Sequence, residues 1–329
     1  MTPPAVVVVS GTRPTGRLHL GHLHGALHNW VRLQETHRCF FFVADWHALT
    51  TDYGDPSGIA DGTIEMVLDW LAVGLDPERC TIFRQSAVKE HAELFLLLGM
   101  LTPVPWLERN PTYKEQREEL REKDLSTIGF LGYPVLQAAD ILMYKATAVP
   151  VGVDQAPHVE LTREIARRFN GTYAPIFPEP QTLLTSAPRI LGTDGRKMSK
   201  SYGNGIFLGD APEDVDRKLS RMVTDPRRAR RTDAGVPDDC PAYQSLHRLY
   251  CTPEELERVN VGCRSAGIGC LECKKIMIAH VLAELEPIRT RRARLTPADA
   301  RAALAAGNAR AQAVAAETMD EVRKAMRLA

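Results

Sequence analysis

The chain has 329 residues, of which 44% are hydrophobic and 25% are charged, and this ordinary globular composition excludes a disordered protein and allows two domains with separate cores. Its 41 basic and 41 acidic residues cancel, so any contact with nucleic acid must depend on local clusters of basic residues. No apolar run approaches the roughly 18 residues that cross a membrane, and the apolar stretch at 6–9 is too short for a signal sequence. We therefore expect a cytoplasmic protein with no membrane segment.

The first part of the chain alternates strand and helix patterns in the order expected of a parallel sheet. Strands are predicted at 6–9, 40–44, 81–83 and 148–151, and helices at 23–33, 63–73, 91–101 and 158–169. The predicted fold class is therefore α/β, with a Rossmann-like doubly wound parallel sheet. Ligands of such sheets bind at the carboxyl ends of the strands, where the polar Asp45 follows the second strand.

Strand patterns nearly vanish after Gly205, and helices are predicted at 213–222, 241–250, 253–259, 273–285 and 297–326. We therefore place a domain boundary near residue 205, with a Rossmann-like catalytic domain over 1–205 and an α-helical domain over 206–329. The helical domain carries basic residues that are candidates for phosphate contact, although a solvated helix face is the alternative. They are Arg217, Lys218, Arg221, Arg227, Arg228, Arg230, Arg231, Arg289, Arg291, Arg292 and Arg294.

Two short motifs carry the strongest chemical signal, His19-Leu20-Gly21-His22 and Lys197-Met198-Ser199-Lys200-Ser201. Two histidines three residues apart at a strand-to-helix turn place both imidazoles on the first turn of a helix, where backbone N–H groups also attract anions. Two lysines on a glycine-rich loop form a mobile cationic clamp suited to a polyphosphate. A histidine pair alone is more often structural, but together the motifs favour nucleotide chemistry.

These motifs resemble the two signature sequences of the class I aminoacyl-tRNA synthetases. The resemblance implies an ATP-dependent ligase in which an amino acid carboxylate attacks the α-phosphate and pyrophosphate leaves. This reaction depends on positioning and on cationic stabilisation more than on covalent help from the protein. The residues expected to act in catalysis are Lys197, Lys200, His19 and His22, with Mg²⁺ arriving on ATP.

The run 133–142, Tyr-Pro-Val-Leu-Gln-Ala-Ala-Asp-Ile-Leu, resembles the amino acid pocket of the tryptophanyl-tRNA synthetases. By that resemblance Asp140 accepts the indole N–H of L-tryptophan, and Tyr133, Gln137 or Gln155 hold its ammonium group. Indole offers one donor and no acceptor, and a buried carboxylate denied that donor is expected to reject phenylalanine by about 10⁴- to 10⁵-fold. The expected partners are L-tryptophan and tRNA(Trp), and family likeness also implies a homodimer.

The segment 149–163 resembles the second nucleotide segment of the same family. The resemblance assigns to ATP Arg13, Pro14, Thr15, Gly21 and His22 on the first crossover, Gly152, Val153 and Asp154 near the ribose, Ile190 at the adenine, and Lys197, Met198, Ser199, Lys200 and Ser201 at the phosphates. The chain departs from the family pattern at Gln116, where a second lysine beyond Lys114 is usual. That departure weakens a phosphate-binding role for the Lys114 segment.

Four of the seven cysteines follow the pattern Cys240-x22-Cys263-x6-Cys270-x2-Cys273. In a cytoplasmic protein such thiols are more often metal ligands than disulfides, and four thiolates suit zinc and a [4Fe–4S] cluster equally. The same spacing resembles a subset of tryptophanyl-tRNA synthetases with a [4Fe–4S] cluster in the anticodon-binding domain, which implies iron–sulfur with zinc as the alternative. Our hypothesis is that the cluster orders the loop that meets the anticodon stem, with Lys274 and Lys275 as candidates to contact phosphate or an anticodon base.

Two other functions remain open from the sequence. The spacing of Tyr133, Gln137 and Asp140 also occurs in some tyrosyl-tRNA synthetases, but their pocket uses a second phenol from the first strand, and this chain has no tyrosine before Tyr53. The chain could also be a synthetase-derived RNA-binding iron–sulfur protein without catalysis. The intact histidine and lysine motifs argue against that loss.

Overall fold

The computed structural model describes residues 6–14, 16–111, 113, 126–152, 155–184 and 190–329, and contacts divide the chain into two compact units. Unit 1 comprises Met1–Gly16, Asn29–Ser186 and Thr296–Ala329, and unit 2 comprises Arg17–His28 and Ala187–Leu295. Each unit therefore combines segments that are distant in sequence. No helix in the described part of the chain has the length and apolar character needed to cross a membrane.

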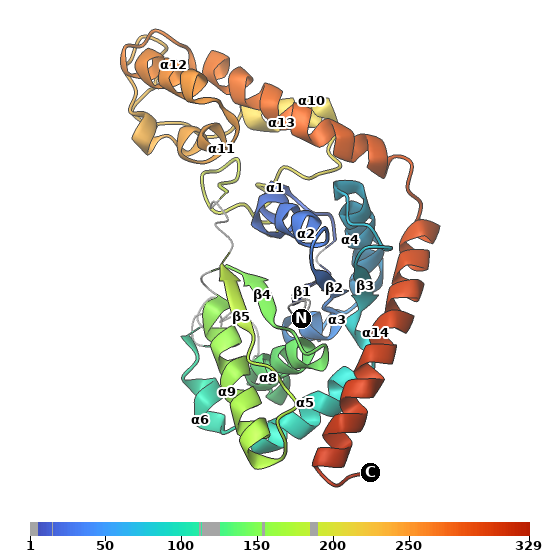
Figure 1. The fold of residues 1–329 in the computed structure, drawn as a ribbon. Helices are drawn as coiled ribbons and strands as arrows, with labels where there is room; N and C mark the ends of the chain where they lie inside the picture. The colour runs from blue at the N-terminus through green and yellow to red at the C-terminus, as the bar shows by residue number, and fades with distance from the viewer. Residues whose placement is uncertain (1–5, 15, 112, 114–125, 153–154, 185–189) are drawn as a thin grey trace. The chain divides into compact units, whose positions relative to one another are not determined.

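Unit 1 is built on a five-stranded sheet in the order β3-β2-β1-β4-β5, with every neighbouring pair parallel (Figure 1). The strands are β1 (Val7–Thr12), β2 (Arg38–Val43), β3 (Thr81–Arg84), β4 (Ala148–Val151) and β5 (Gln181–Leu184). The predicted α/β class with a doubly wound parallel sheet is confirmed. The direction of winding reverses between β1 and β4, which is the switch point where such sheets bind ligands.

The helices of unit 1 lie in the connections between strands, except α14, which follows unit 2 in the sequence. They are α2 (His28–Leu33), whose first residue belongs to unit 2, α3 (Asp45–Asp52), α4 (Ile59–Val73), η2 (Gln85–Ala87), α5 (Glu90–Leu101), α6 (Val104–Glu108), α8 (Ile128–Met143), α9 (Ala156–Thr172) and α14 (Pro297–Ala325). The sequence predicted α4, α5, α9 and α14 to within a few residues. It did not predict α3, α6 or α8 as helices, nor β5 as a strand.

Alternating aromatic residues of β2 pack on opposite faces of the sheet, because successive side chains of a strand point to opposite sides. Phe40 and Phe42 belong to the core formed with α5, α8 and α9. On the other face, Phe41 stacks on Trp30 of α2 at 4.5 Å, and Trp30 meets Trp70 of α4 edge-on at 5.2 Å. Helices therefore cover both faces of the sheet, as a buried parallel sheet requires.

The C-terminal helix α14 packs on β3, the strand at one edge of the sheet (Figure 1). A Cβ at Gly307 would lie only 1.8 Å from the Ile82 carbonyl oxygen, so this glycine lets the helix touch the strand. The Asn308 side chain accepts the Arg84 backbone N–H at 2.9 Å, which satisfies a donor on the free edge. The predicted boundary near residue 205 therefore differs from the compact units, since 296–329 packs with the sheet.

Among the described residues of unit 2, the regular elements are helices, joined by loops and two isolated bridges. Its elements are α1 (Leu20–His22), η1 (Leu23–Leu27), α10 (Pro212–Ser220), η4 (Pro237–Asp239), η5 (Tyr243–His247), α11 (Arg248–Tyr250), α12 (Pro253–Arg264) and α13 (Cys270–Arg292). Residues 17–28 join this unit because the Leu20 N–H donates to Ile206 O at 3.0 Å and the Leu208 N–H donates to Leu18 O at 2.9 Å. This pairing places the histidine motif beside the residues that follow the lysine motif.

Replacing Gly307 by alanine tests the packing of α14 on the sheet. We expect Gly307→Ala to lower the free energy of unfolding by about 1–3 kcal/mol, the usual cost of overpacking, measured by urea denaturation. Gly99→Ala is the matched control, because a Cβ added to Gly99 on helix α5 would meet nothing within 4 Å, and alanine there is neutral or stabilises by up to about 1 kcal/mol. Equal effects of the two substitutions would contradict the close approach.

Candidate active site

The carboxyl ends of β1 and β4 lead into residues predicted to bind ATP. Arg13 and Pro14 follow β1, and Gly152 follows β4. The Arg13 guanidinium lies 3.5 Å from the Thr51 hydroxyl, and burial lowers its pKa against the opposing effect of the nearby Tyr133. The switch point of unit 1 thus places a nucleotide candidate beside a candidate for the amino acid. Three other predicted ATP residues, Thr15, Val153 and Asp154, lie outside the described residues.

His19 and His22 cap the helical stretch that begins at α1. His19 is the N-cap residue, and its Nδ1 accepts the Gly21 backbone N–H at 3.0 Å, while His22 Nδ1 accepts the His19 backbone N–H at 3.2 Å. The two ring centroids lie 3.9 Å apart. Because each Nδ1 is an acceptor, each neutral ring carries its proton on Nε2. Both rings therefore have an Nε2–H that is suited to donate to an anion, as predicted for this motif.

Burial keeps both rings of this cap uncharged. It lowers the pKa of His19 to about 4, and together with the neighbouring His19 it lowers the pKa of His22 to about 3. A Cβ at Gly21 would lie 2.8 Å from the His19 ring, so a side chain at this position would displace the capping imidazole. The pair therefore offers neutral N–H donors and no positive charge.

The lysine motif lies on a loop whose shape is fixed by Asn204. The Asn204 side chain accepts the Ser199 backbone N–H at 2.8 Å and donates to the Lys197 carbonyl at 3.2 Å. Met198 is buried beneath the loop, whereas Lys197 and Lys200 are exposed at least in part. The loop thus uses the methionine as an anchor and presents both lysine side chains at the surface, as a phosphate clamp requires.

The remaining predicted residues of this loop have structural contacts of their own. Ile190 is buried, and its carbonyl accepts the Met198 N–H at 2.9 Å. The hydroxyls of Ser199 and Ser201 lie 2.8 Å apart. These contacts hold the two sides of the loop together around the buried methionine.

Asp140 lies on α8 with no exposed surface, and three side chains satisfy its charge. Its carboxylate accepts His47 Nε2 at 2.8 Å, His91 Nδ1 at 2.6 Å, and the Gln85 amide at 2.8 and 2.9 Å. Burial by itself would raise the pKa of Asp140, but the hydrogen bonds from His47 and His91 outweigh it and hold the pKa below its usual range. The interior of unit 1 therefore holds an ionised carboxylate.

The three donors around this carboxylate were not predicted from the sequence. Gln85 directly follows β3, and its Oε1 accepts the Trp46 backbone N–H at 3.1 Å. His47 lies on α3 after β2, and His91 lies on α5, where its Nε2 is 2.7 Å from the Tyr144 hydroxyl. The usable signal was position, because His47 and Gln85 follow the carboxyl ends of strands, where polar residues of such sheets gather.

A second polar chain orients Tyr133, the residue one turn before Gln137 on α8. The Tyr133 hydroxyl lies 3.0 Å from His158 Nε2, and His158 Nδ1 lies 3.1 Å from the Asn110 amide nitrogen. Since the amide nitrogen donates to Nδ1, Nε2 carries the proton and donates to the phenol oxygen. The hydroxyl proton of Tyr133 is thus directed away from His158. Gln137 and Gln155 are half-buried, the latter as the N-cap residue of α9.

The four predicted metal ligands lie near one another in unit 2. Cys270 and Cys273 are on the first turn of α13, Cys263 lies near the end of α12, and Cys240 follows η4. Burial, with a further contribution from the other three thiols, raises the pKa of Cys273 to about 12. The structure therefore brings together the cysteines that the spacing singled out.

The surroundings of these thiols suit a bound metal group. A Cβ at Gly235 would lie 2.6 Å from Cys263 Sγ, so only glycine leaves room beside this sulfur. Arg228 Nη1 lies 3.6 Å from Cys263 Sγ, and Cys273 Sγ lies 3.3 Å from His247 Nε2. Hydrogen-bond donors directed at thiolate sulfurs commonly surround iron–sulfur and zinc sites.

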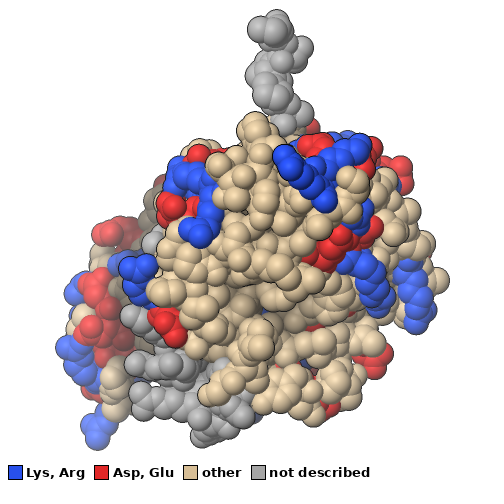
Figure 2. All heavy atoms as spheres, turned by 90° about the horizontal axis from the view of Figure 1, so that it is seen from below, with Lys and Arg blue, Asp and Glu red and all other residues tan. Residues whose placement is uncertain are grey.

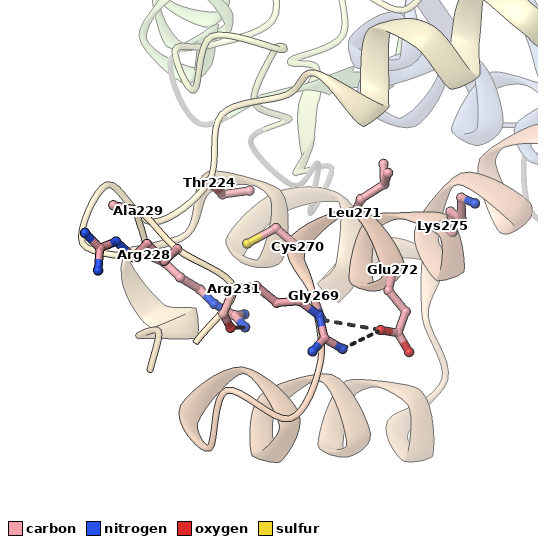
Figure 3. A pocket seen from close by; sticks show the side chains of 10 residues that line it. Thr224, Arg228, Ala229, Arg231, Gly269, Cys270, Leu271, Glu272 and Lys275 are labelled. Carbon is pink, nitrogen blue, oxygen red and sulfur yellow. Dashed lines mark hydrogen bonds and ion pairs between the residues drawn. The ribbon is translucent and has the colours of Figure 1, made fainter. Parts of the chain in front are cut away.

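A pocket of about 590 Å³ opens beside Cys270 and is lined by Arg230, Arg231 and Lys275 (Figure 3). Figure 3 shows the Cys270 side chain directed toward the loop that carries Arg228. The pocket is basic and lies next to the four cysteines, as expected of a surface that meets a nucleic acid backbone.

Two basic residues predicted to contact phosphate have internal roles instead. Lys274 is buried, and its Nζ donates to Ser220 O at 2.8 Å and to Met222 O at 2.5 Å. Arg228 is also buried, and its guanidinium donates to backbone carbonyls, including Arg231 O at 3.2 Å. The interpretation of these two as phosphate ligands was wrong, because both are used to close the loops around the cysteines.

The chain is similar to known proteins over nearly its full length. Residues 2–285 match the family described as tRNA synthetases class I (W and Y). The tryptophan–tRNA ligase of Thermotoga maritima is 53% identical, covering 98% of this chain and 99% of that protein, and the one of Aquifex aeolicus is 46% identical with the same coverage. The crystal structure of the Campylobacter jejuni tryptophanyl-tRNA synthetase with ADP and tryptophan superposes with a TM-score of 0.85, at 30% identity, covering 97% of this chain and 99% of that one.

The protonation of the histidine cap gives a test by imidazole NMR. In the ligand-free protein, His19 and His22 should show neutral rings with the proton on Nε2 between about pH 5 and about pH 8, because burial lowers their pKa to about 4 and about 3. The unfolded protein, whose histidines titrate near ~6.5, is the control.

The sign for stability follows from the same pKa difference. The rings have pKa values of about 4 and about 3 in the folded protein and ~6.5 in the unfolded protein. Between these pH values the unfolded state binds more protons than the folded state. The contribution of the rings to stability is therefore complete above pH ~6.5 and declines as the pH falls toward the folded pKa values. A ring of the folded protein that titrates near ~6.5 would show that the cap becomes charged, contrary to the expected neutral donors.

Proposed function

Because the chain belongs to the class I tRNA synthetases and is a tryptophan–tRNA ligase, we propose that the residues described above divide its reaction into two steps. L-Tryptophan is first activated with ATP to tryptophanyl-adenylate with release of pyrophosphate, and it is then transferred to tRNA(Trp). The observation that carries the proposed residue roles is the buried, ionised Asp140 in unit 1.

For the activation step we assign the charge to the lysine loop and the hydrogen bonding to the histidine cap. Negative charge builds on the α-phosphate and on the leaving pyrophosphate, so fixed donors and cations aimed at these oxygens lower the barrier. His19 and His22 supply neutral Nε2–H donors, while Lys197 and Lys200 supply positive charge from a surface loop. Mg²⁺ carried on the nucleotide would neutralise part of the same charge.

For the amino acid we assign the indole N–H to Asp140 and the ammonium group to Tyr133, Gln137 or Gln155. The Gln85 amide nitrogen touches both oxygens of Asp140, so one of these contacts can be given up to an incoming N–H. The three protein donors also change the expected selectivity. A substrate without an N–H does not leave this carboxylate unpaired, so the rejection of about 10⁴- to 10⁵-fold expected from an orphaned group does not apply.

ATP–pyrophosphate exchange with each standard amino acid tests the function directly. Exchange should occur with tryptophan alone. Exchange with tyrosine would instead support a tyrosine–tRNA ligase, and the absence of exchange with every amino acid would support an RNA-binding protein without catalysis.

A tryptophan analogue with sulfur in place of the indole N–H tests the role of Asp140 in the same assay. We expect kcat/KM for exchange to fall by about 10- to 150-fold, because a hydrogen bond to a charged group contributes about 1.5–3 kcal/mol. An unchanged value would remove Asp140 from indole recognition. A loss of about 10⁴-fold would mean that the histidine and glutamine donors do not satisfy the carboxylate.

For the four cysteines we propose a [4Fe–4S] cluster held by Cys240, Cys263, Cys270 and Cys273, with zinc as the alternative. The thiol donor set and the space beside Cys263 support a metal group here. Aminoacylation needs no electron transfer, so the group would act by ordering the loops of unit 2. Arg230, Arg231 and Lys275 in the neighbouring pocket would then be placed to contact the anticodon arm of the tRNA.

Replacing one thiol separates the two steps of the reaction. Cys273→Ser should abolish the visible absorption of the anaerobically purified protein and weaken tRNA charging, while ATP–pyrophosphate exchange continues at its original rate. Cys251→Ser is the control, since Cys251 stands outside the four-cysteine pattern. Normal charging by a cluster-free Cys273→Ser protein would contradict the ordering role, and a colourless parent protein that contains zinc would assign the site to zinc.

We also propose that the protein is a homodimer and that it acts in the cytoplasm, where its tRNA and ATP substrates are found. Large apolar side chains are exposed on unit 1, with Leu96 and Met100 one turn apart on α5, Val104 at the start of α6 and Ile128 at the start of α8. Figure 2 shows a broad uncharged stretch of surface between the charged clusters. Exposed apolar area of this kind supports a protein–protein interface, and light scattering in solution distinguishes dimer from monomer.

A further inference from the structure

Three side chains with metal-binding atoms meet in unit 2, apart from the residues assigned above. His24 lies in η1, His28 follows four residues later at the start of α2, and Glu284 lies on α13. Their ligand atoms all lie within 4.8 Å of one another. The two histidines share one side of the helical stretch, where the i→i+5 turns of η1 mark the kind of irregularity that often accompanies functional sites.

Both imidazoles point at the same carboxylate. His24 Nε2 lies 3.0 Å from Glu284 Oε2, and His28 Nε2 lies 2.9 Å from Glu284 Oε1. The two rings are edge to face, with centroids 4.9 Å apart. Each Nε2 atom therefore contacts a different oxygen of the same carboxylate, and each histidine presents a ring nitrogen of the kind that binds metal.

We propose that His24, His28 and Glu284 form a binding site for one divalent transition-metal ion, with zinc as the best match. Two histidines and one glutamate are a known zinc donor set that leaves a fourth position open. Hard cations such as Mg²⁺ prefer oxygen ligands throughout, so two imidazoles disfavour them.

The distances fit an ion of this size. Zinc bonds of about 2.0–2.2 Å in a tetrahedral arrangement place neighbouring ligand atoms about 3.3–3.5 Å apart. The nitrogen-to-oxygen distances of 2.9 and 3.0 Å need to open by only a few tenths of an ångström to admit the ion. Small rotations of the three side chains would supply such a change.

Solvent access and a supporting phenol complete the site. The side chain of His28 is 47% exposed, against 13% for His24 and 23% for Glu284, so an ion can enter from the His28 side. The Tyr250 hydroxyl donates to Glu284 Oε2 and lies 2.8 Å from His24 Nε2. Tyr250 is thus a positioning residue that fixes the carboxylate, in the manner of the outer partners of metal ligands.

An ion here would tie two functional segments of unit 2 together. His24 follows the capping histidines by two residues, and Glu284 lies three turns beyond Cys273 on α13. The metal would join the helix that carries the phosphate donors to the helix that carries two of the four thiols. Its role would be structural, since none of the three ligands lies in the motifs assigned to substrate.

Zinc titration by calorimetry tests the site in the full-length protein. Glu284→Gln, His24→Ala and His28→Ala should each remove one equivalent of bound zinc or weaken it by at least about 100-fold, while Tyr250→Phe should weaken it by about 10- to 100-fold. His37→Ala, which removes a histidine in another part of the chain, should leave binding unchanged. Any zinc bound by the four cysteines contributes equally to the parent and to each variant, because all are compared after identical metal loading.

Imidazole NMR of the unmutated protein gives a second measurement that does not depend on how the variants fold. One equivalent of zinc should shift the ring nitrogens of His24 and His28 and leave those of His19 and His22 in place. Equal zinc binding by the parent and the three ligand variants would overturn the proposal. Zinc-induced shifts confined to other histidines would overturn it as well.

Discussion

The reversal of winding between β1 and β4 is the constraint on which the candidate site of unit 1 depends. In a parallel sheet every strand is followed by a crossover, and where the crossovers diverge to opposite faces the two neighbouring strand ends are left uncovered. Arg13 leaves β1 at this point and Gly152 leaves β4. Arg13 interacts electrostatically with Tyr133 on α8, the helix that directly precedes β4.

The charged carboxylate of Asp140 determines which polar side chains surround it in the core of unit 1. Removing an ionised group from water costs several kcal/mol unless donors replace the lost hydration. Asp140 obtains its donors from segments that follow β2 and β3, so each neighbouring strand-to-helix junction contributes to one polar cluster. Gln85 does two tasks at once, because its amide nitrogen binds the carboxylate and its oxygen accepts the backbone of α3. The cluster therefore fixes the positions of helices as well as the charge.

Features with a local signal could be predicted from the sequence, and features that depend on distant contacts could not. Apolar runs located four of the five strands of the sheet, while β5, whose residues are all at least partly exposed, gave no such run. Helix α8 was missed because Gly132 and Pro134 weaken a helical pattern that tertiary packing restores. The meaning of Gly307 depends on Ile82, more than 200 residues earlier, and the donors to Asp140 lie 49 to 93 residues away from it in the sequence.

Within unit 2, helix α13 connects features that the sequence presents as separate motifs. Its first turn supplies Cys270 and Cys273, its middle is buried through Met277 and Val281, and Glu284 then contacts the segment that begins with the capping histidines. That segment is itself paired by backbone hydrogen bonds with the chain that leaves the lysine loop. Helix α13 spans 23 residues and contributes side chains to both places. The four cysteines and the capping histidines are therefore connected through one packed element of unit 2.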